Sequence, residues 1–324
     1  MLAGKSILVT GAGRGIGRAT ARLAAELGAC VVVNDIDAAG AGAVADEITS
    51  TGGDAVADAT DVSSWAGAEQ LVARAVERFG RLHGVVNNAA VFVPGVFENL
   101  SEADWRKAIE VNVLGTAFLM THAVRAMLRG GGGAIVNIIS GSHQGASDMA
   151  PYSTSKGAVA SMIYAAAIDL GPRGIRVNGV SPVAATKMEQ AASDFGQTLG
   201  RPPMVSPLTP EDNAPAIGFL LSDDSRDFNG QNLRLERDGL SMLGHPTVLL
   251  PYPRLQTDSY AAVRDAAVSQ LGPMIQPLGV RYGRLAHEWT DFTPLTRRPD
   301  PTTPRTARGG DRPNRTGVPA PSRA

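Results

Sequence analysis

The sequence of 324 residues has little cysteine and almost no net charge, which argues against disulfide-rich proteins and against proteins that bind nucleic acid. It contains one cysteine, Cys30, so no disulfide can form within the chain and nothing opposes a reducing compartment. Its formal net charge of −1 gives no basis for binding nucleic acid or an anionic membrane. Hydrophobic residues nevertheless make up 44% of the chain, which is enough to build a substantial core.

Targeting and membrane signals are also missing from the sequence. The N-terminus runs directly into a strand-like segment, without a basic region followed by an apolar one, so no signal peptide is predicted. We find no apolar stretch that approaches the roughly 18 to 20 residues of a membrane span. We therefore expect a cytoplasmic protein with no metal site and no membrane or nucleic-acid partner.

Residues 1–244 alternate short β-branched runs with longer helical patterns, which is typical of a parallel sheet covered by helices on both faces. This pattern predicts an α/β fold, a single doubly wound (Rossmann) domain with a mostly parallel seven-stranded sheet. A ligand should bind at the carboxyl ends of the strands. The predicted strands are Ser6–Thr10, Cys30–Asn34, Ala55–Ala57, Gly84–Asn87, Ala134–Ile139, Arg176–Val180 and Asn232–Glu236.

The C-terminal part of the chain changes character. Residues 245–290 carry enough apolar side chains for one or two helices packed on the domain, and for no separate domain. Residues 291–324 are rich in proline and arginine and lack apolar periodicity, so we expect this segment to be disordered. The alternative is a basic tail that contacts an anionic partner.

A glycine-rich turn, TGAGRGIG at residues 10–17, follows the first predicted strand and opens an amphipathic helix. Gly11 and Gly15 permit backbone angles and a close approach that a Cβ would prevent. The helix N-terminus then presents free N–H groups to a pyrophosphate. Asp35 ends the second strand about 20 residues later, where a carboxylate can accept hydrogen bonds from an adenosine ribose. Alternatively, Asp35 or Asp37 caps the next helix.

Tyr152 and Lys156 stand four residues apart on a predicted helix, so their side chains share one face. An unperturbed tyrosine has a pKa near 10. A neighbouring ammonium favours the phenolate and lowers that pKa toward the range useful for general acid–base catalysis. Ser140 lies upstream, and Ser142 is an alternative for the same role. Taken alone, a serine at this position is more often part of a loop, and a tyrosine more often contributes only to packing.

Together these segments resemble the short-chain dehydrogenase/reductase family over about residues 4–240. The turn resembles the family's TGxxxGxG motif, and Asp61-Val62 resembles its adenine-contacting pair. Residues 87–90, Asn-Asn-Ala-Ala, resemble its Asn-Asn-Ala-Gly motif. The residues that match the four catalytic positions are Asn112, Ser140, Tyr152 and Lys156.

This resemblance implies a role for each residue of the set. Tyr152 would exchange a proton with the substrate oxygen, and Ser140 would polarise the carbonyl. Lys156 would bind the nicotinamide ribose and lower the pKa of the tyrosine, while Asn112 would hold a water that links Lys156 to solvent. The implied cofactor-binding residues are Gly11, Arg14, Gly15, Ile16, Gly17, Asp35, Asp61, Val62, Asn88, Ala89, Ala90, Tyr152, Lys156, Pro182, Val183 and Thr186.

The sequence departs from the family pattern at three places. Ala90 replaces the usual glycine, and Ser140 lies one residue closer to Tyr152 than in many members. The segment after Pro182 lacks the usual glycine; its Pro-x-Ala-x-x-x-Met pattern also occurs in the branch that contains the peroxisomal 3-hydroxyacyl-CoA dehydrogenases.

The resulting prediction is an NAD-dependent oxidoreductase that interconverts a secondary alcohol and a ketone. The segment 188–211 is predicted to form a mobile lid, and its apolar side chains include Phe195, Leu199, Met204 and Val205. They predict an apolar substrate such as a hydroxyacyl thioester, steroid, terpenoid or polyketide-like compound. Arg14 can reach a 2′-phosphate, so NADP stays possible, and an NADPH-dependent 3-oxoacyl reductase is the first alternative. A non-catalytic dinucleotide-binding scaffold or sensor is the second. The resemblance also implies a homodimer or homotetramer.

Overall fold

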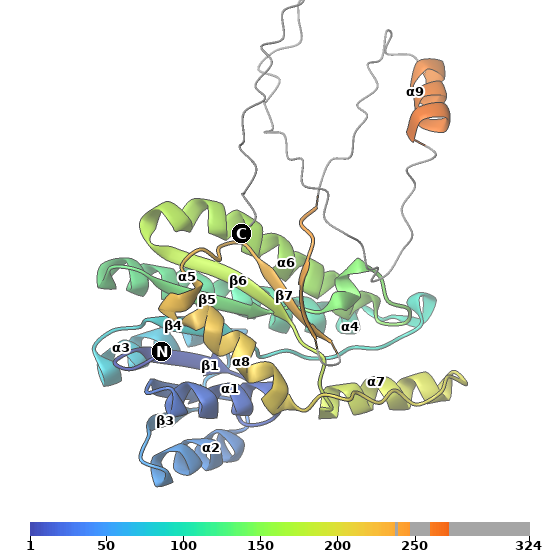
Figure 1. The fold of residues 1–324 in the computed structure, drawn as a ribbon. Coiled ribbons are helices and arrows are strands. Elements are labelled where there is room, and N and C mark those ends of the chain that lie inside the picture. The colour runs from blue at the N-terminus through green and yellow to red at the C-terminus, as the bar shows by residue number, and fades with distance from the viewer. Residues whose placement is uncertain (237–238, 247–259, 272–324) are drawn as a thin grey trace, which may run out of the picture. The chain divides into compact units, whose positions relative to one another are not determined.

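A sheet of eight strands organises the part of the chain that the computed structural model describes, residues 1–236, 239–246 and 260–271 (Figure 1). Its strand order is β3-β2-β1-β4-β5-β6-β7-β8. Neighbours from β3 to β7 pair in parallel, and β8 pairs with β7 in the antiparallel sense. The strands are β1 (Ser6–Thr10), β2 (Cys30–Asn34), β3 (Asp54–Asp58), β4 (Gly84–Asn87), β5 (Gly133–Ile138), β6 (Ile175–Ser181), β7 (Asn232–Glu236) and β8 (Gly239–Leu243).

The doubly wound fold class is confirmed, and all seven predicted strands occur within one residue of their expected bounds. The predicted strand count was wrong, because β8 adds an eighth strand at the sheet edge. An antiparallel strand needs only a short turn after its partner, whereas each parallel strand needs a long crossover that the sequence pattern reveals. The side chains of Leu240 and Met242 in β8 are exposed, so this strand lacks a strong burial pattern.

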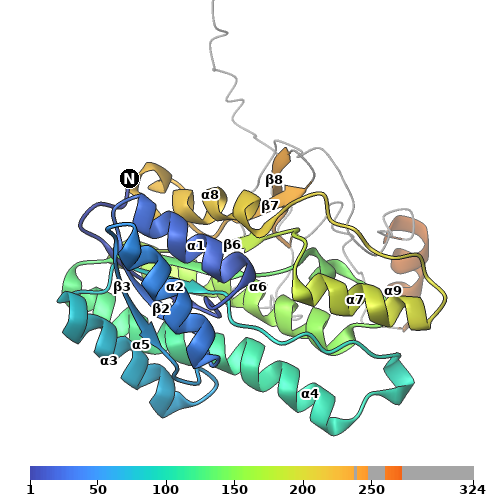
Figure 2. The same ribbon diagram turned by 90° about the horizontal axis from the view of Figure 1, so that it is seen from below.

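Helices cover both faces of the sheet (Figure 2). One face carries α1 (Gly15–Glu26), α2 (Ala38–Ser50) and α8 (Pro210–Leu221), and the other carries α3 (Trp65–Phe79), α5 (Gly115–Gly130) and α6 (Ala150–Leu170). Each face has its own hydrophobic core, and successive side chains of β1 point to opposite faces. Ile7 and Val9 therefore pack in the core beneath α1, α2 and α8, whereas Leu8 packs in the core beneath α3, α5 and α6. Strands buried on both faces explain the continuous apolar runs of the sequence.

A 29-residue helical stretch, Glu102–Gly130, runs through α4 (Glu102–Ala108), a π-helical turn (Ile109–Leu114) and α5. By length and composition it could cross a membrane, contrary to the sequence expectation. Half of its most apolar window is buried inside the fold, where α5 packs against the sheet and α3. A buried core helix meets the same criteria as a membrane span, so the stretch is weak support for one.

The remaining elements connect the core or follow it. The helix α7 (Lys187–Thr198) lies within the predicted lid, and α9 (Tyr260–Ala266) leads into a π-helical turn, Ala267–Leu271. The short helical turns are Phe97–Asn99, Gly141–Gln144, Gly171–Arg173 and Asp223–Ser225. A helix is therefore present in the predicted extension 245–290, and its packing on the domain stays a prediction. The predicted disordered segment 291–324 lies outside the described residues.

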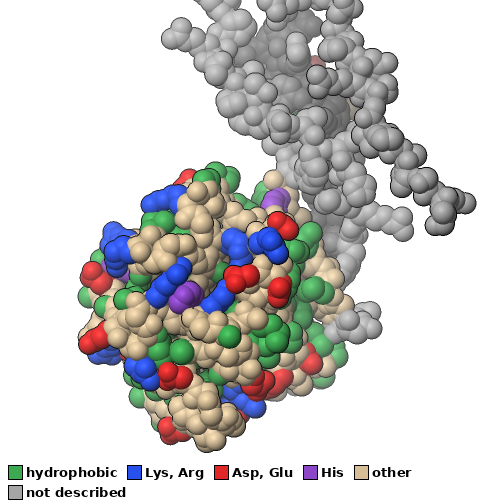
Figure 3. All heavy atoms as spheres, turned by 60° about the vertical axis from the view of Figure 1, so that its left-hand side comes forward, with side chains coloured by type: hydrophobic (Ala, Val, Ile, Leu, Met, Phe, Trp, Pro, Cys, Tyr) green, Lys and Arg blue, Asp and Glu red, His purple; other side chains and the backbone are tan. Residues whose placement is uncertain are grey.

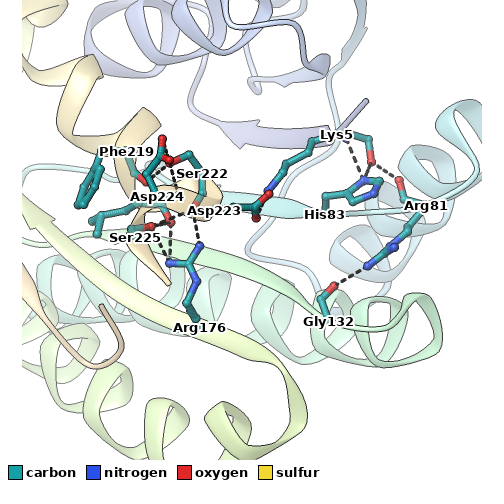
Figure 4. A network of polar contacts seen from close by, with 12 residues as sticks. Lys5, Arg81, His83, Gly132, Arg176, Phe219, Ser222, Asp223, Asp224 and Ser225 are labelled. Carbon is teal, nitrogen blue, oxygen red and sulfur yellow. Dashed lines mark hydrogen bonds and ion pairs between the residues drawn. The ribbon is translucent and has the colours of Figure 1, made fainter. Parts of the chain in front are cut away.

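A polar network joins the amino ends of the strands to the end of α8 (Figure 4). The Arg176 guanidinium donates to the carbonyl oxygens of Leu220 (3.0 Å) and Ser222 (2.9 Å), and Lys5 forms an ion pair with Asp223. Figure 3 turns the left-hand side of Figure 1 forward and shows Lys and Arg side chains interspersed with Asp and Glu side chains on the surface. Because these contacts occupy Arg176 and Lys5 with partners in the chain, we assign the network a structural role.

Candidate active site

A cavity of about 960 Å³ lies at the carboxyl ends of the strands. Its wall includes residues that directly follow β1, β2, β4 and β6, namely Gly11, Asp35, Asn88 and Pro182, and Ser140 shortly after β5. This is the position where doubly wound sheets bind ligands, because the strand order reverses at β1 and the crossovers diverge. The predicted cofactor-binding residues that line it are Gly11, Arg14, Gly15, Ile16, Asp35, Asp61, Val62, Asn88, Ala89, Ala90, Tyr152, Lys156, Pro182, Val183 and Thr186.

The glycine turn lies at the start of α1. Gly11 and Gly15 have φ angles of 60° and 55°, a region that favours glycine. Gly17 does not line the cavity, unlike the other predicted cofactor-binding residues. A Cβ there would lie 2.2 Å from the Gly11 carbonyl oxygen, so Gly17 is required for the turn to pack on the helix. The Asn88 side-chain amide donates to the carbonyl oxygens of Thr10 (2.8 Å) and Gly11 (2.9 Å), which ties the loop after β4 to this turn.

Asp35 is held at the end of β2 by two backbone donors. Its Oδ2 accepts from the Gly13 N–H at 2.9 Å, and its Oδ1 accepts from the Asp37 N–H at 3.0 Å. Asp37, by contrast, caps α2 by accepting from the Gly40 N–H at 3.2 Å. The capping alternative therefore applies to Asp37, while Asp35 presents an oriented negative charge to the cavity.

Ser140, Tyr152 and Lys156 meet at one wall of the cavity. The Ser140 hydroxyl lies beside the Tyr152 phenol and accepts from the Ser142 backbone N–H at 3.2 Å. The Lys156 ammonium donates to the Ile138 carbonyl oxygen at 2.7 Å and lies 5.7 Å from the centre of the Tyr152 ring. Ser142, the alternative serine, does not line the cavity.

Burial determines the titration of this pair. It raises the pKa of Tyr152 to about 12, although the hydrogen bond with Ser140 acts in the opposite direction. It lowers the pKa of Lys156 to about 8. The sequence expectation of a tyrosine pKa depressed by the neighbouring ammonium is wrong for this arrangement, because the loss of water around the phenolate outweighs the other effects.

Asn112 is 1% exposed and does not line the cavity. It lies in the π-helical turn between α4 and α5, a feature that is frequent at functional sites. Its side-chain amide pairs with the backbone of Val91, accepting from the N–H at 2.8 Å and donating to the carbonyl oxygen at 3.0 Å. It also donates to the Ser155 hydroxyl at 2.9 Å. Asn112 therefore joins the loop after β4 to the helix that carries Tyr152 and Lys156.

Sequence reasoning missed most of the apolar wall of the cavity. The Phe92 ring meets the Tyr152 ring edge to face, with centroids 5.3 Å apart and an interplanar angle of 71°. Of the predicted lid side chains, Met188 and Met204 line the cavity, whereas Phe195, Leu199 and Val205 do not. The further residues that line it are Asn34, Ile36, Thr60, Ser63, Val91, Lys107, Val111, Ile138, Ile139, Met149, Ala184, Ala185, Lys187, Glu189, Ala192 and Pro210.

The predicted lid is held by hydrogen bonds within itself and by an ion pair with the loop before α6. The Ser193 hydroxyl accepts from the Met204 N–H at 3.0 Å, which folds the chain after α7 back onto that helix. Arg201 forms an ion pair with Asp148, which has a φ of 58° and is the only non-glycine residue with a positive φ in the described part of the chain. This ion pair links the lid to the loop that carries Met149.

The family model described as enoyl-(acyl carrier protein) reductase matches residues 11–237, more than half of the chain. The chain belongs to the short-chain dehydrogenase/reductase family. Members of this family bind nicotinamide dinucleotide cofactors, and the family assignment supports an oxidoreductase that acts on CH–OH groups.

Several characterised short-chain dehydrogenases are similar to the chain. The (2S)-[(R)-hydroxy(phenyl)methyl]succinyl-CoA dehydrogenase subunit BbsD of Thauera aromatica is 40% identical over 70% of this chain and 92% of its own length. The cis-4-hydroxycyclohexanecarboxylate dehydrogenase of Sinomonas cyclohexanicum is 40% identical over 67% of this chain and 88% of its own. The structure of a 7α-hydroxysteroid dehydrogenase complexed with NADH and 7-oxo glycochenodeoxycholic acid is 34% identical, with a TM-score of 0.65 over 74% of this chain and 95% of that one.

The residues present fit the cofactor that the short-chain dehydrogenase family implies. The glycine turn leaves space for a pyrophosphate at the N-terminus of α1, since a Cβ at Gly15 would meet only the Thr186 side chain, at 3.8 Å. Asp35 offers a ribose an acidic acceptor at the next strand end. Within the described ranges, no group of three or more His, Cys, Asp or Glu side chains could hold a metal ion.

Proposed function

We propose that the chain is an NAD-dependent dehydrogenase that interconverts a secondary alcohol and a ketone on an apolar substrate. The observation that carries this proposal is the convergence of the Tyr152 phenol, the Ser140 hydroxyl and the Lys156 ammonium on the cavity that Asp35 also lines. When bound, the nicotinamide cofactor supplies or accepts the hydride. The residues of the chain orient the substrate oxygen and move its proton.

Ser140 and Tyr152 act on the substrate oxygen. The Ser142 N–H donates to the Ser140 hydroxyl, whose single proton points to the Tyr152 oxygen in the free protein and would turn to the carbonyl oxygen of a bound substrate. The Tyr152 phenol, with a pKa raised to about 12 by burial, holds the proton that the oxygen gains during ketone reduction. In alcohol oxidation the proton passes in the reverse direction, and the phenolate must form first.

Lys156 and Asn112 support that proton transfer in different ways. The Lys156 ammonium favours the Tyr152 phenolate by charge, and the Ile138 carbonyl oxygen orients it. Asn112 acts as a positioning residue, because its amide holds Val91 and Ser155 on either side of the site. A scaffold that only binds a dinucleotide would need neither arrangement.

The proposed preference for NAD over NADP rests on Asp35, whose carboxylate would repel a 2′-phosphate. The NADPH-dependent 3-oxoacyl reductase is the alternative, and the observation in its favour is the exposed Arg14 at the edge of the same cavity. A homodimer or homotetramer and a cytoplasmic location stay predictions.

The test is the variant Tyr152→Phe, which removes the phenolic proton and keeps the ring. We expect turnover of a secondary alcohol to fall by about 10² to 10⁴, while NADH binding, followed by fluorescence titration, is unchanged. Phe97→Leu, at an exposed ring outside the cavity, is the control for nonspecific damage. Wild-type turnover in Tyr152→Phe would contradict the mechanism. NADH binding by the wild-type protein with no turnover of any alcohol would favour the scaffold.

A further inference from the structure

We propose that Phe92 determines substrate specificity, and that the substrate is a secondary alcohol whose carbinol carbon belongs to an apolar ring or is bonded to one. This inference rests on the proposed function and narrows its substrate class. It is carried by the backbone contacts around Phe92, by its contact with Tyr152 and by the composition of the cavity wall.

Phe92 lies on a loop that is fixed on both sides. On one side the Val91 N–H and carbonyl oxygen are both bonded to the Asn112 amide, at 2.8 and 3.0 Å. On the other side the Gly95 N–H donates to the Asp148 carbonyl oxygen at 2.8 Å, and Gly95 pairs with Met149 in an isolated β-bridge. These contacts hold the segment 91–95 in place, so the Phe92 ring forms a rigid part of the cavity wall.

The position of this ring decides which part of a substrate it meets. Its centroid lies 5.3 Å from the centroid of the Tyr152 ring, and both side chains line the cavity. We therefore place a substituent of the carbinol carbon beside Phe92. Aromatic rings gain additional energy from offset or edge-to-face contacts with other rings, and a flat ring covers more of such a wall than a flexible chain can.

Among the described residues, three methionines line the same cavity as Phe92 and Tyr152. Met188 and Met204 come from the lid and Met149 from the loop before α6. Unbranched thioether side chains fill irregular gaps and make favourable contacts with rings. The helix α7 also contributes two charged side chains to the cavity, Lys187 and Glu189, and the Glu189 carboxylate lies beside the Ser206 backbone. A rigid aromatic surface in a cavity that adaptable methionines also line suits a ring better than an extended chain.

The test compares ring and chain alcohols of equal carbon number: cyclohexanol against hexan-2-ol, and 1-phenylethanol against octan-2-ol. We expect the wild-type protein with NAD to favour the ring member of each pair in kcat/KM. Phe92→Leu keeps an apolar side chain and removes the ring, and should reduce that preference about three- to tenfold. Phe92→Tyr should retain the preference, and Phe97→Leu, at the exposed ring, should leave it unchanged.

A second readout follows binding without turnover. With NAD present, which has no hydride to give a ketone, acetophenone should raise the melting temperature of the wild-type protein more than octan-2-one does, and Phe92→Leu should lose this difference. Equal or higher kcat/KM for the chain alcohols in the wild-type protein would refute the ring proposal and leave the dehydrogenase intact. An unchanged ring preference in Phe92→Leu would refute the role of Phe92. If the wild-type protein turns over none of the alcohols, and Tyr152→Phe therefore does not differ from it, the proposed function itself is refuted.

Discussion

Replacing Asp35 with serine should shift the cofactor preference from NAD toward NADP. In the wild-type protein the carboxylate is 8% exposed and is held by the N–H groups of Gly13 (2.9 Å) and Asp37 (3.0 Å), so it cannot swing away from a 2′-phosphate. The variant removes the negative charge and leaves both N–H groups facing the position that the phosphate would take. Serine is small enough to avoid a new steric conflict there.

The size of the effect follows from the charges. Two unit charges 4 Å apart interact by about 4 kcal/mol at an effective dielectric constant of 20, and by about 2.8 kcal/mol at 6 Å. Even the longer separation corresponds to about a 100-fold difference in catalytic efficiency. We therefore expect the wild-type protein to prefer NAD by roughly 10²-fold, and Asp35→Ser to lose most of that ratio.

The assay is the initial rate of reduced-cofactor formation at one saturating alcohol concentration, with NAD and NADP each varied to give kcat/KM. Asp37→Ser is the matched control, because serine also caps helices and the substitution removes one nearby carboxylate that does not line the cavity. A melting curve of each variant checks that the fold is intact. Equal use of both cofactors by the wild-type protein would refute the reasoning, as would an unchanged ratio in a folded Asp35→Ser protein.

Two further predictions concern proton transfer and the lid. The rate of alcohol oxidation should rise about tenfold per pH unit up to about pH 8 and then level off. The form of the protein that oxidises the alcohol has lost one proton from the Tyr152–Lys156 pair, and the pair loses its first proton near the pKa of Lys156, about 8. Ketone reduction should decline above the same pH, and an oxidation profile still rising steeply at pH 10 would contradict this order of titration. Arg201→Gln should raise KM for the alcohol several-fold with little change in kcat, because it removes the partly buried ion pair with Asp148, whose side chain is 17% exposed. Added salt should raise KM in the wild-type protein and not in Arg201→Gln; the exposed Arg226→Gln serves as control, and an identical salt response in all three would exclude a role for the ion pair.

The strands and the glycine turn could be predicted from the sequence because their signals are local. A β-branched run such as Cys30–Asn34 is buried on both faces, and its ends coincide with the structure. Tyr152 and Lys156 could be paired for the same reason, since four residues on a helix bring side chains to one face. The strand β8 was missed because its place depends on pairing with the edge of a finished sheet rather than on its own pattern.

The sequence by itself determined the α/β fold class, the position of the cavity at the strand ends and the four residues that resemble a catalytic set. Only the tertiary structure decided how that set titrates, because the pKa of Tyr152 depends on how much water the surrounding elements exclude. It also decided which side chains line the cavity together with Tyr152. Phe92, Met149 and Met204 come from three separate segments, which the contacts of Asn112, Gly95 and Ser193 bring together. No local periodicity encodes such a wall, because each residue reaches it through hydrogen bonds made by other parts of the chain.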